Sequence, residues 1–229
     1  MEYVEVARSD SERGELVLRE RRPGPDDTGG GPTVLELRAN GVFVMDTAEH
    51  ASELALADAA LAAVADPRRV LVGGLGLGFT LDRVLGDRRV AHVDVVEIEP
   101  DLVAWMRDGT IPHGPRLLAD SRARVVVADV VAAVTEAGPS TYDVVLLDVD
   151  NGPGHLVHAR NSAIYDEPFL RAVVDRLEPG GALVIWSAAP APELVTALSE
   201  VFGEVEELDQ AVRLQDRDEH YWLYAAHRA

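Results

Sequence analysis

The sequence contains no cysteine and no lysine, and each absence excludes whole classes of chemistry. Without cysteine there is no disulfide framework, no zinc–thiolate site and no cysteine nucleophile. All 21 basic residues are arginines, so a Schiff-base lysine and the lysine of a phosphate-binding P-loop are excluded as well.

Long apolar runs and positive charge are also scarce. No apolar stretch reaches the roughly 18 residues that a membrane-spanning helix needs, and Met1 to Glu5 lack the pattern of a signal peptide. With 40 acidic residues against 21 basic ones, the net charge is −19. This field repels nucleic acid and anionic membranes and attracts cationic ligands, although solubility is the simpler explanation of it. We therefore expect a cytoplasmic protein without nucleic-acid or membrane partners.

The 229 residues, 47% of them hydrophobic, suffice for one domain with a small appendage. Residues 1–46 resemble strands joined by a turn-rich segment at 23–32 and an Asn40-Gly41 turn, which predicts a small antiparallel β-meander. From 47 to 229, apolar runs alternate with helical segments, which predicts an α/β domain with a mostly parallel sheet covered on both faces. The expected strands lie at 70–72, 92–98, 124–127, 142–147, 182–186, 204–208 and 221–226, and the expected helices at 47–65, 79–85, 100–107, 130–137, 167–177 and 192–202.

A glycine-rich loop ends the first strand of this larger domain and opens the next helix. Its glycines are Gly73, Gly74, Gly76 and Gly78. They let the backbone turn sharply and approach a ligand closely, at a helix N-terminus that favours an electron-rich group. A dinucleotide fingerprint needs G-x-G-x-x-G, whereas this loop has G-x-G-x-G, a spacing typical of S-adenosylmethionine sites.

Acidic residues close the next three expected strands. Glu97 can accept both hydroxyls of a ribose, or it can be a solvated charge at a strand end. Asp129 can accept a hydrogen bond from an adenine amino group, and it also suits a helix N-cap. Asp148 opens the run Asp148-Val149-Asp150-Asn151 at the edge where open parallel sheets bind ligands.

Other polar residues follow this run. His155 and His158 are three residues apart, but no third ligand has suitable spacing, so we predict no metal site. His155 fits a lid or a second acid–base group better. Tyr165 can line a substrate pocket or pack in the core, and packing is the simpler alternative.

These motifs together resemble the spermidine synthases (polyamine aminopropyltransferases) and their methyltransferase-fold relatives. The resemblance covers most of the chain, from the meander and a helix carrying Glu53 through the glycine loop to Leu177-Glu178-Pro179-Gly180-Gly181. It implies a Rossmann-like class I methyltransferase fold with a seven-stranded sheet. It also implies that Glu97 binds ribose, that Asp129 binds adenine and that Asp148 acts near the amine nucleophile. We therefore expect Asp148 to take a proton from this amine and Asp150 to help hold a cationic substrate. The expected cofactor site comprises Gly73, Gly74, Gly76, Leu77, Gly78, Glu97, Ile98, Asp129, Val130 and Asp148; the expected substrate site comprises Glu53, Asn151, His155 and Tyr165.

Two departures from the family pattern concern the donor and the substrate. Leu77 stands where the family has an aspartate that would meet the amino group of the decarboxylated donor, and Asn151 replaces a second aspartate. Both favour methyl transfer from intact S-adenosylmethionine to a small, amine-containing molecule. The alternative is aminopropyl transfer from decarboxylated S-adenosylmethionine, favoured by the overall resemblance and the acidic charge. A second alternative is a non-catalytic nucleoside-binding protein on the same fold. The exposed edge of the meander could pair between subunits and form a homodimer.

Overall fold

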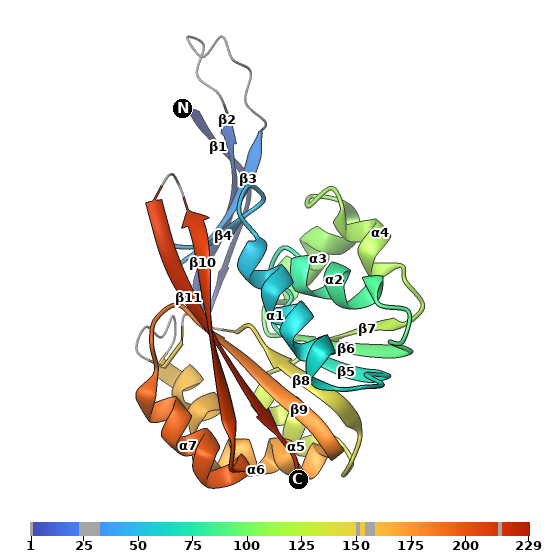
Figure 1. Ribbon diagram of the computed structural model, residues 1–229. Coiled ribbons are helices and arrows are strands. Elements are labelled where there is room, and N and C mark those ends of the chain that lie inside the picture. Colours follow the sequence, from blue (N-terminus) through green and yellow to red (C-terminus); the bar gives the residue numbers. More distant parts are fainter. Residues whose placement is uncertain (1, 23–32, 150–151, 154–158, 215–216) are drawn as a thin grey trace.

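A computed structural model describes residues 2–22, 33–149, 152–153, 159–214 and 217–229 of the chain. Its secondary structure forms two sheets (Figure 1). The strands are β1 (Glu2–Ser11), β2 (Gly14–Arg22), β3 (Val34–Ala39), β4 (Val42–Asp46), β5 (Arg69–Gly73), β6 (His92–Glu97), β7 (Ala123–Val127), β8 (Tyr142–Leu147), β9 (Leu177–Ser187), β10 (Val205–Leu214) and β11 (Arg217–His227). The helices are α1 (Ala51–Ala63), α2 (Phe79–Gly86), α3 (Pro100–Asp108), α4 (Gly114–Leu118), α5 (Val130–Glu136), the 3-10 helix η1 (Ala159–Tyr165), α6 (Glu167–Arg176) and α7 (Pro192–Phe202).

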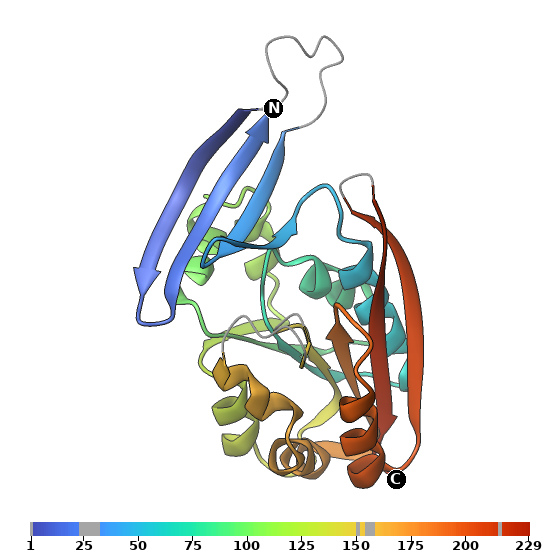
Figure 2. The ribbon, with the colours of Figure 1, turned by 90° about the vertical axis from the view of Figure 1, so that its left-hand side faces the viewer.

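The first four strands form an antiparallel sheet in the order β1-β2-β3-β4. Its inner strands carry apolar side chains, such as Leu18 and Leu37, that join the core of the larger domain. The outer strand β1 is mostly exposed, and its burial does not alternate. The four-stranded sheet therefore packs against one end of the seven-stranded sheet and its helices (Figure 2).

The larger sheet has seven strands in the order β10-β11-β9-β8-β5-β6-β7. Strands β5 to β9 pair in parallel, whereas β11 pairs antiparallel with β9 and β10. The expected Rossmann-like fold is thus confirmed. Strands β10 and β11 are longer than the apolar pattern predicted, since they run on as a hairpin beyond the sheet (Figure 1).

Helices cover both faces of this sheet. Helices α1, α2, α3 and α4 contribute to one apolar cluster, together with β5, β6 and β8. Helices α5, α6 and α7 contribute to the cluster on the opposite face. The alternation of strand side chains explains this division, because Val70 and Val72 belong to the first cluster and Leu71 to the second. No helix in the described part of the chain is long and apolar enough to cross a membrane.

Candidate functional site

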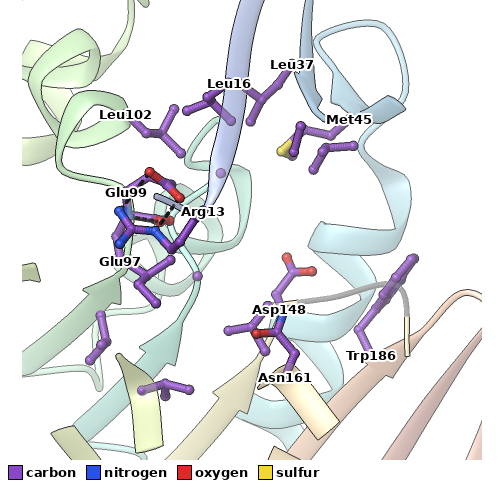
Figure 3. Close-up of a pocket in the computed structure, with 18 of the residues that line it drawn as sticks. Arg13, Leu16, Leu37, Met45, Glu97, Glu99, Leu102, Asp148, Asn161 and Trp186 are labelled. Atoms are coloured by element: carbon purple, nitrogen blue, oxygen red, sulfur yellow. Dashed lines mark hydrogen bonds and ion pairs between the residues drawn. The ribbon is translucent and has the colours of Figure 1, made fainter. Parts of the chain in front are cut away.

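A cavity of about 660 Å³ lies between the four-stranded sheet and the carboxyl ends of the parallel strands. Its walls come from the β1–β2 turn, β4, the start of α1, the glycine loop and the residues that follow β6, β7 and β8. Figure 3 shows Glu97, Glu99 and Arg13 gathered in one part of it, and Asp148, Asn161 and Trp186 in another. Both parts belong to one cavity, which has room for a nucleoside with an attached chain.

The glycine loop has backbone angles that side chains rarely permit. The φ angles of Gly74, Gly76 and Gly78 are 94°, 49° and 87°. A Cβ atom at Gly74 would lie 2.1 Å from the carbonyl oxygen of Asp148, and one at Gly76 would lie 2.6 Å from Sδ of Met45. Glycine therefore lets the loop pass closely between β8 and β4 while its backbone borders the cavity.

Glu97 is the acidic residue that ends β6, and it is almost completely buried. Its Oε2 accepts a hydrogen bond from the Leu75 N–H at 2.9 Å, and its Oε1 accepts one from the Glu99 N–H at 2.8 Å. Burial raises its pKa, despite these bonds. Each carboxylate oxygen keeps a further lone pair, so this cavity-lining group can still accept ligand hydroxyls.

Asp129 follows β7, and of its two expected roles, helix N-cap and adenine binding, the structure shows the N-cap. Its Oδ1 accepts a hydrogen bond from the Val131 N–H at 2.8 Å, which makes it the N-cap of α5. The same residue lines the cavity beside Ile98 and Val130. Capping leaves the second carboxylate oxygen available, so an adenine-binding role stays compatible with this geometry.

Asp148 and Glu53 bring two carboxyl groups to the other part of the cavity. Asp148 follows β8, and Glu53 lies in the first turn of α1. Burial and then the charge of Glu53 raise the pKa of Asp148 to about 7, while a hydrogen bond of 3.1 Å from the Thr80 hydroxyl opposes this rise. Burial also raises the pKa of Glu53, whose Oε2 accepts a 2.7 Å hydrogen bond from Ser52. Asp148 is thus suited to exchange a proton near neutral pH.

Two aromatic side chains line the same part of the cavity. The rings of Trp186, at the end of β9, and Tyr221, on β11, lie 4.8 Å apart and are tilted by 59°. Burial and nearby carboxylates, Glu53 first among them, raise the pKa of Tyr221. Aromatic rings and carboxylates that line the same part of a cavity can bind an alkyl chain that carries a positive charge. No motif in the sequence points to Tyr221 as a residue of this cavity.

The structure brings most of the expected site residues to the cavity. Those that line it are Gly74, Gly76, Glu97, Ile98, Asp129, Val130, Asp148 and Glu53. Gly73, Gly78 and Tyr165 do not line it, and Tyr165 packs in the core cluster with Ile164 and Phe169. Asp150, Asn151 and His155 lie outside the described residues, so their expected roles stay predictions.

Leu77 differs most from its expected position. Its side chain is completely buried in the apolar cluster and does not line the cavity. Only its backbone takes part in the loop, where the carbonyl oxygen lies 2.6 Å from a ring nitrogen of His113. The Leu77 side chain therefore lies in the core and does not contact a molecule bound in the cavity.

Comparisons with known proteins agree with this geometry. A family model described as the spermine/spermidine synthase domain matches residues 49–202. The chain is 32% identical over 151 residues to a polyamine aminopropyltransferase of a Synechococcus species, covering 61% of this chain and 46% of that protein. It is 30% identical over 123 residues to a putrescine N-methyltransferase of Nicotiana tabacum, covering 54% of this chain and 31% of that protein. The chain thus spans less than half the length of these relatives.

Solved structures match almost the whole of this chain at lower sequence identity. A spermidine synthase in complex with the transition-state analogue AdoDATO superposes with a TM-score of 0.81 at 18% identity, covering 98% of this chain and 74% of that one. A spermidine synthase from Thermotoga maritima gives a TM-score of 0.77 at 17% identity, covering 98% and 73%. The likeness extends to the N-terminal sheet, which lies outside the family-model match.

Proposed function

Because the chain belongs to the spermine/spermidine synthase domain family, we propose that it is an aminopropyltransferase. It transfers the aminopropyl group of decarboxylated S-adenosylmethionine to a primary amine of a diamine such as putrescine. The family resemblance expected from the sequence is confirmed, whereas the preference for methyl transfer is replaced by its alternative.

The charge of the cavity carries this proposal. Eight of its lining residues are acidic: Glu12, Glu15, Glu49, Glu53, Glu97, Glu99, Asp129 and Asp148. Arg13 is the basic residue among the described lining residues, and its guanidinium bonds Glu99. Intact S-adenosylmethionine carries a carboxylate that would lie among these acids, whereas the decarboxylated donor and a diamine carry positive charges only. The cavity thus favours the decarboxylated donor.

The geometry of the cavity supports a binding site for the nucleoside part of this donor. The backbone of the glycine loop can pass against the sulfur and its substituents, Glu97 can accept the ribose hydroxyls, and Asp129 can accept a hydrogen bond from the adenine amino group. The donor then extends toward Asp148, where the acceptor amine would approach between Glu53 and the two aromatic rings.

The reaction needs a neutral amine in line with the sulfonium. The amine nitrogen attacks the aminopropyl carbon bonded to sulfur, the carbon–sulfur bond breaks, and its electron pair remains on sulfur. The products are 5′-methylthioadenosine and a secondary ammonium ion. An alkylammonium has no lone pair, so the acceptor must first give up a proton, which we assign to Asp148. The protein otherwise contributes positioning and exclusion of water.

Methyl transfer remains the second candidate, because a putrescine N-methyltransferase is among the relatives. Both reactions use an amine acceptor and differ in the carbon that is attacked. The sequence argument for methyl transfer rested on the replacement of two aspartates of the family pattern by Leu77 and Asn151, and Asn151 lies outside the described residues.

Mass spectrometry of the products tests the proposal. The protein is incubated with putrescine and either decarboxylated or intact S-adenosylmethionine. We expect spermidine and 5′-methylthioadenosine from the first mixture and no N-methylputrescine from the second. N-methylputrescine formed faster than spermidine would overturn the assignment in favour of methyl transfer. Absence of both products, with the donor still bound in calorimetry, would point to the non-catalytic alternative.

A further inference from the structure

Arg13 enters the nucleoside part of the cavity from the turn between β1 and β2. The turn is fastened to the neighbouring β3–β4 turn, because Asn40 Oδ1 accepts a hydrogen bond from the Glu15 N–H at 3.0 Å and Asn40 Nδ2 donates one to the Arg13 carbonyl at 3.3 Å. Gly14 has a φ of 107°, and a Cβ there would collide with the Asn40 side chain. The backbone that carries Arg13 is therefore held in place before any ligand binds.

The Arg13 guanidinium joins this turn to the larger domain through Glu99. Its Nε lies 2.6 Å from Oε1 and its Nη2 lies 3.0 Å from Oε2, a bidentate arrangement (Figure 3). A second contact runs parallel to it, since the Ser9 hydroxyl on β1 donates to Oδ2 of Asp101 on α3. These two contacts, with three hydrogen bonds in all, hold the β1–β2 hairpin over the residues that follow β6.

Glu99 is linked in turn to the carboxylate expected to bind ribose. The Glu99 N–H donates to Oε1 of Glu97 at 2.8 Å, and both side chains line the cavity. The two carboxylates are only two residues apart and repel each other, and the charge of Glu99 contributes to the raised pKa of Glu97. A cation bound to Glu99 offsets that repulsion and fixes the direction of its side chain.

We propose that Arg13 is a positioning residue for the nucleoside: by bridging Glu99 from the β1–β2 turn it closes this end of the cavity and holds the carboxylate pair for the ribose. The inference rests on the proposed donor site, and it does not depend on which group is transferred. Arg13 acts through Glu99 and does not touch the reacting atoms. It should therefore affect donor affinity and leave the chemical step largely unchanged.

Calorimetric binding of 5′-methylthioadenosine to the full chain tests this role without turnover. We expect Arg13→Ala to raise the Kd roughly tenfold and Arg13→Lys to raise it less, because lysine keeps the charge but loses the bidentate geometry. The matched control is Arg22→Ala, since Arg22 lies on the same sheet and pairs with Glu20, and neither residue lines the cavity. Its Kd should equal that of the unchanged protein. In steady-state assays, Arg13→Ala should raise the KM for the donor with kcat within about twofold.

A double-mutant cycle identifies the partner through which Arg13 acts. If Arg13 acts through Glu99, Arg13→Ala in a Glu99→Gln background should change the Kd by less than twofold. Equal Kd values for Arg13→Ala and the unchanged protein, or full additivity with Glu99→Gln, would overturn the proposal. A drop in kcat at constant KM would overturn it as well. The proposed reaction fails separately, when the unchanged protein binds the nucleoside but forms no spermidine.

Discussion

Glu53 and Asp148 face one cavity from two different elements, and the charge of Glu53 adds to the effect of burial in raising the pKa of Asp148 to about 7. Glu53, in the first turn of α1, thus raises the pKa of Asp148, which follows β8. A carboxyl group with this pKa is partly ionised near neutral pH, where it can receive a proton from an ammonium group. The first three predictions concern this pair.

Asp148→Asn should lower kcat/KM for the amine by about a hundredfold or more, because the amide cannot take the proton. In the unchanged protein, kcat/KM should fall as the pH drops below about 7, the pKa of Asp148. Initial rates of spermidine formation between pH 5.5 and 9 provide the measurement. A variant with more than a tenth of the original rate would rule out Asp148 as the proton acceptor.

The same substitution should stabilise the fold at alkaline pH. Because the pKa of Asp148 is raised from 3.8 to about 7, its ionisation lowers the free energy of unfolding. This destabilisation builds up as the pH rises from 3.8 to 7, and it amounts to at most about 4 kcal/mol at higher pH. Asp148→Asn removes this penalty, and its advantage should therefore grow between pH 5.5 and 8.5. Urea unfolding at both pH values measures the difference, and an advantage that shrinks with rising pH would contradict the raised pKa.

Glu53→Gln should move the acidic limb of the pH–rate profile to lower pH, because it removes the negative charge that helps to raise the pKa of Asp148. It should also raise the KM for the diamine through the loss of one carboxylate. Asp58→Asn is the matched control, since Asp58 lies on the same helix but pairs with Arg83 at the surface. An identical shift in both variants would show that the effect is not specific to the cavity.

The strand ends could be predicted from the sequence because buried parallel strands are continuous apolar runs. Glu97, Asp129 and Asp148 directly follow or end such runs, and the topology of a parallel sheet brings them to one edge. The pattern did not predict the short helix α4, which spans only Gly114–Leu118 and is too short to show a period. Strand β1 belongs to the expected meander, although it is mostly exposed and its burial does not alternate.

Individual side-chain contacts between the N-terminal sheet or the C-terminal hairpin and the rest of the chain could not be predicted. Arg13 is 86 residues from Glu99 in the sequence, and it sits in a turn where arginine is unremarkable. Tyr221 reaches the cavity only because β11 pairs with β9, which places it beside Trp186. The direction of Leu77 was equally hidden, because the sequence does not say which loop side chains turn into the core.

Gly74→Ala should abolish nucleoside binding and destabilise the fold by about 3 kcal/mol or more, since a Cβ would meet the Asp148 carbonyl at 2.1 Å with φ at 94°. Gly86→Ala is the control, because nothing lies within 4 Å of a Cβ there and the residue ends α2. It should be neutral or stabilising by up to about 1 kcal/mol. Thermal unfolding and calorimetry on both variants check the pair, and a Gly74→Ala protein that binds normally would show that the loop can relax.

Asp94→Asn should cost about 2 kcal/mol of stability and spare activity. Asp94 is buried in β6, where it accepts hydrogen bonds from Arg124 at 2.6 and 2.8 Å and from the Tyr142 hydroxyl at 2.9 Å. These contacts, with His92, outweigh burial and hold its pKa below the ordinary value. Urea unfolding and kcat below the unfolding transition measure the two effects. A variant with unchanged stability would show that this network contributes nothing.

Three contacts join Asp148 to the glycine loop and to the first turn of α2. The Asp148 N–H donates to the Gly73 carbonyl at 2.9 Å, the Thr80 hydroxyl donates to the Asp148 carboxylate, and Gly74 packs against the Asp148 carbonyl. The loop that would hold the donor and the group that would deprotonate the acceptor are therefore hydrogen-bonded and packed together. A substitution that displaces the glycine loop should therefore also displace the Asp148 carboxylate, whereas Tyr221 and the β1–β2 turn lie on separate elements.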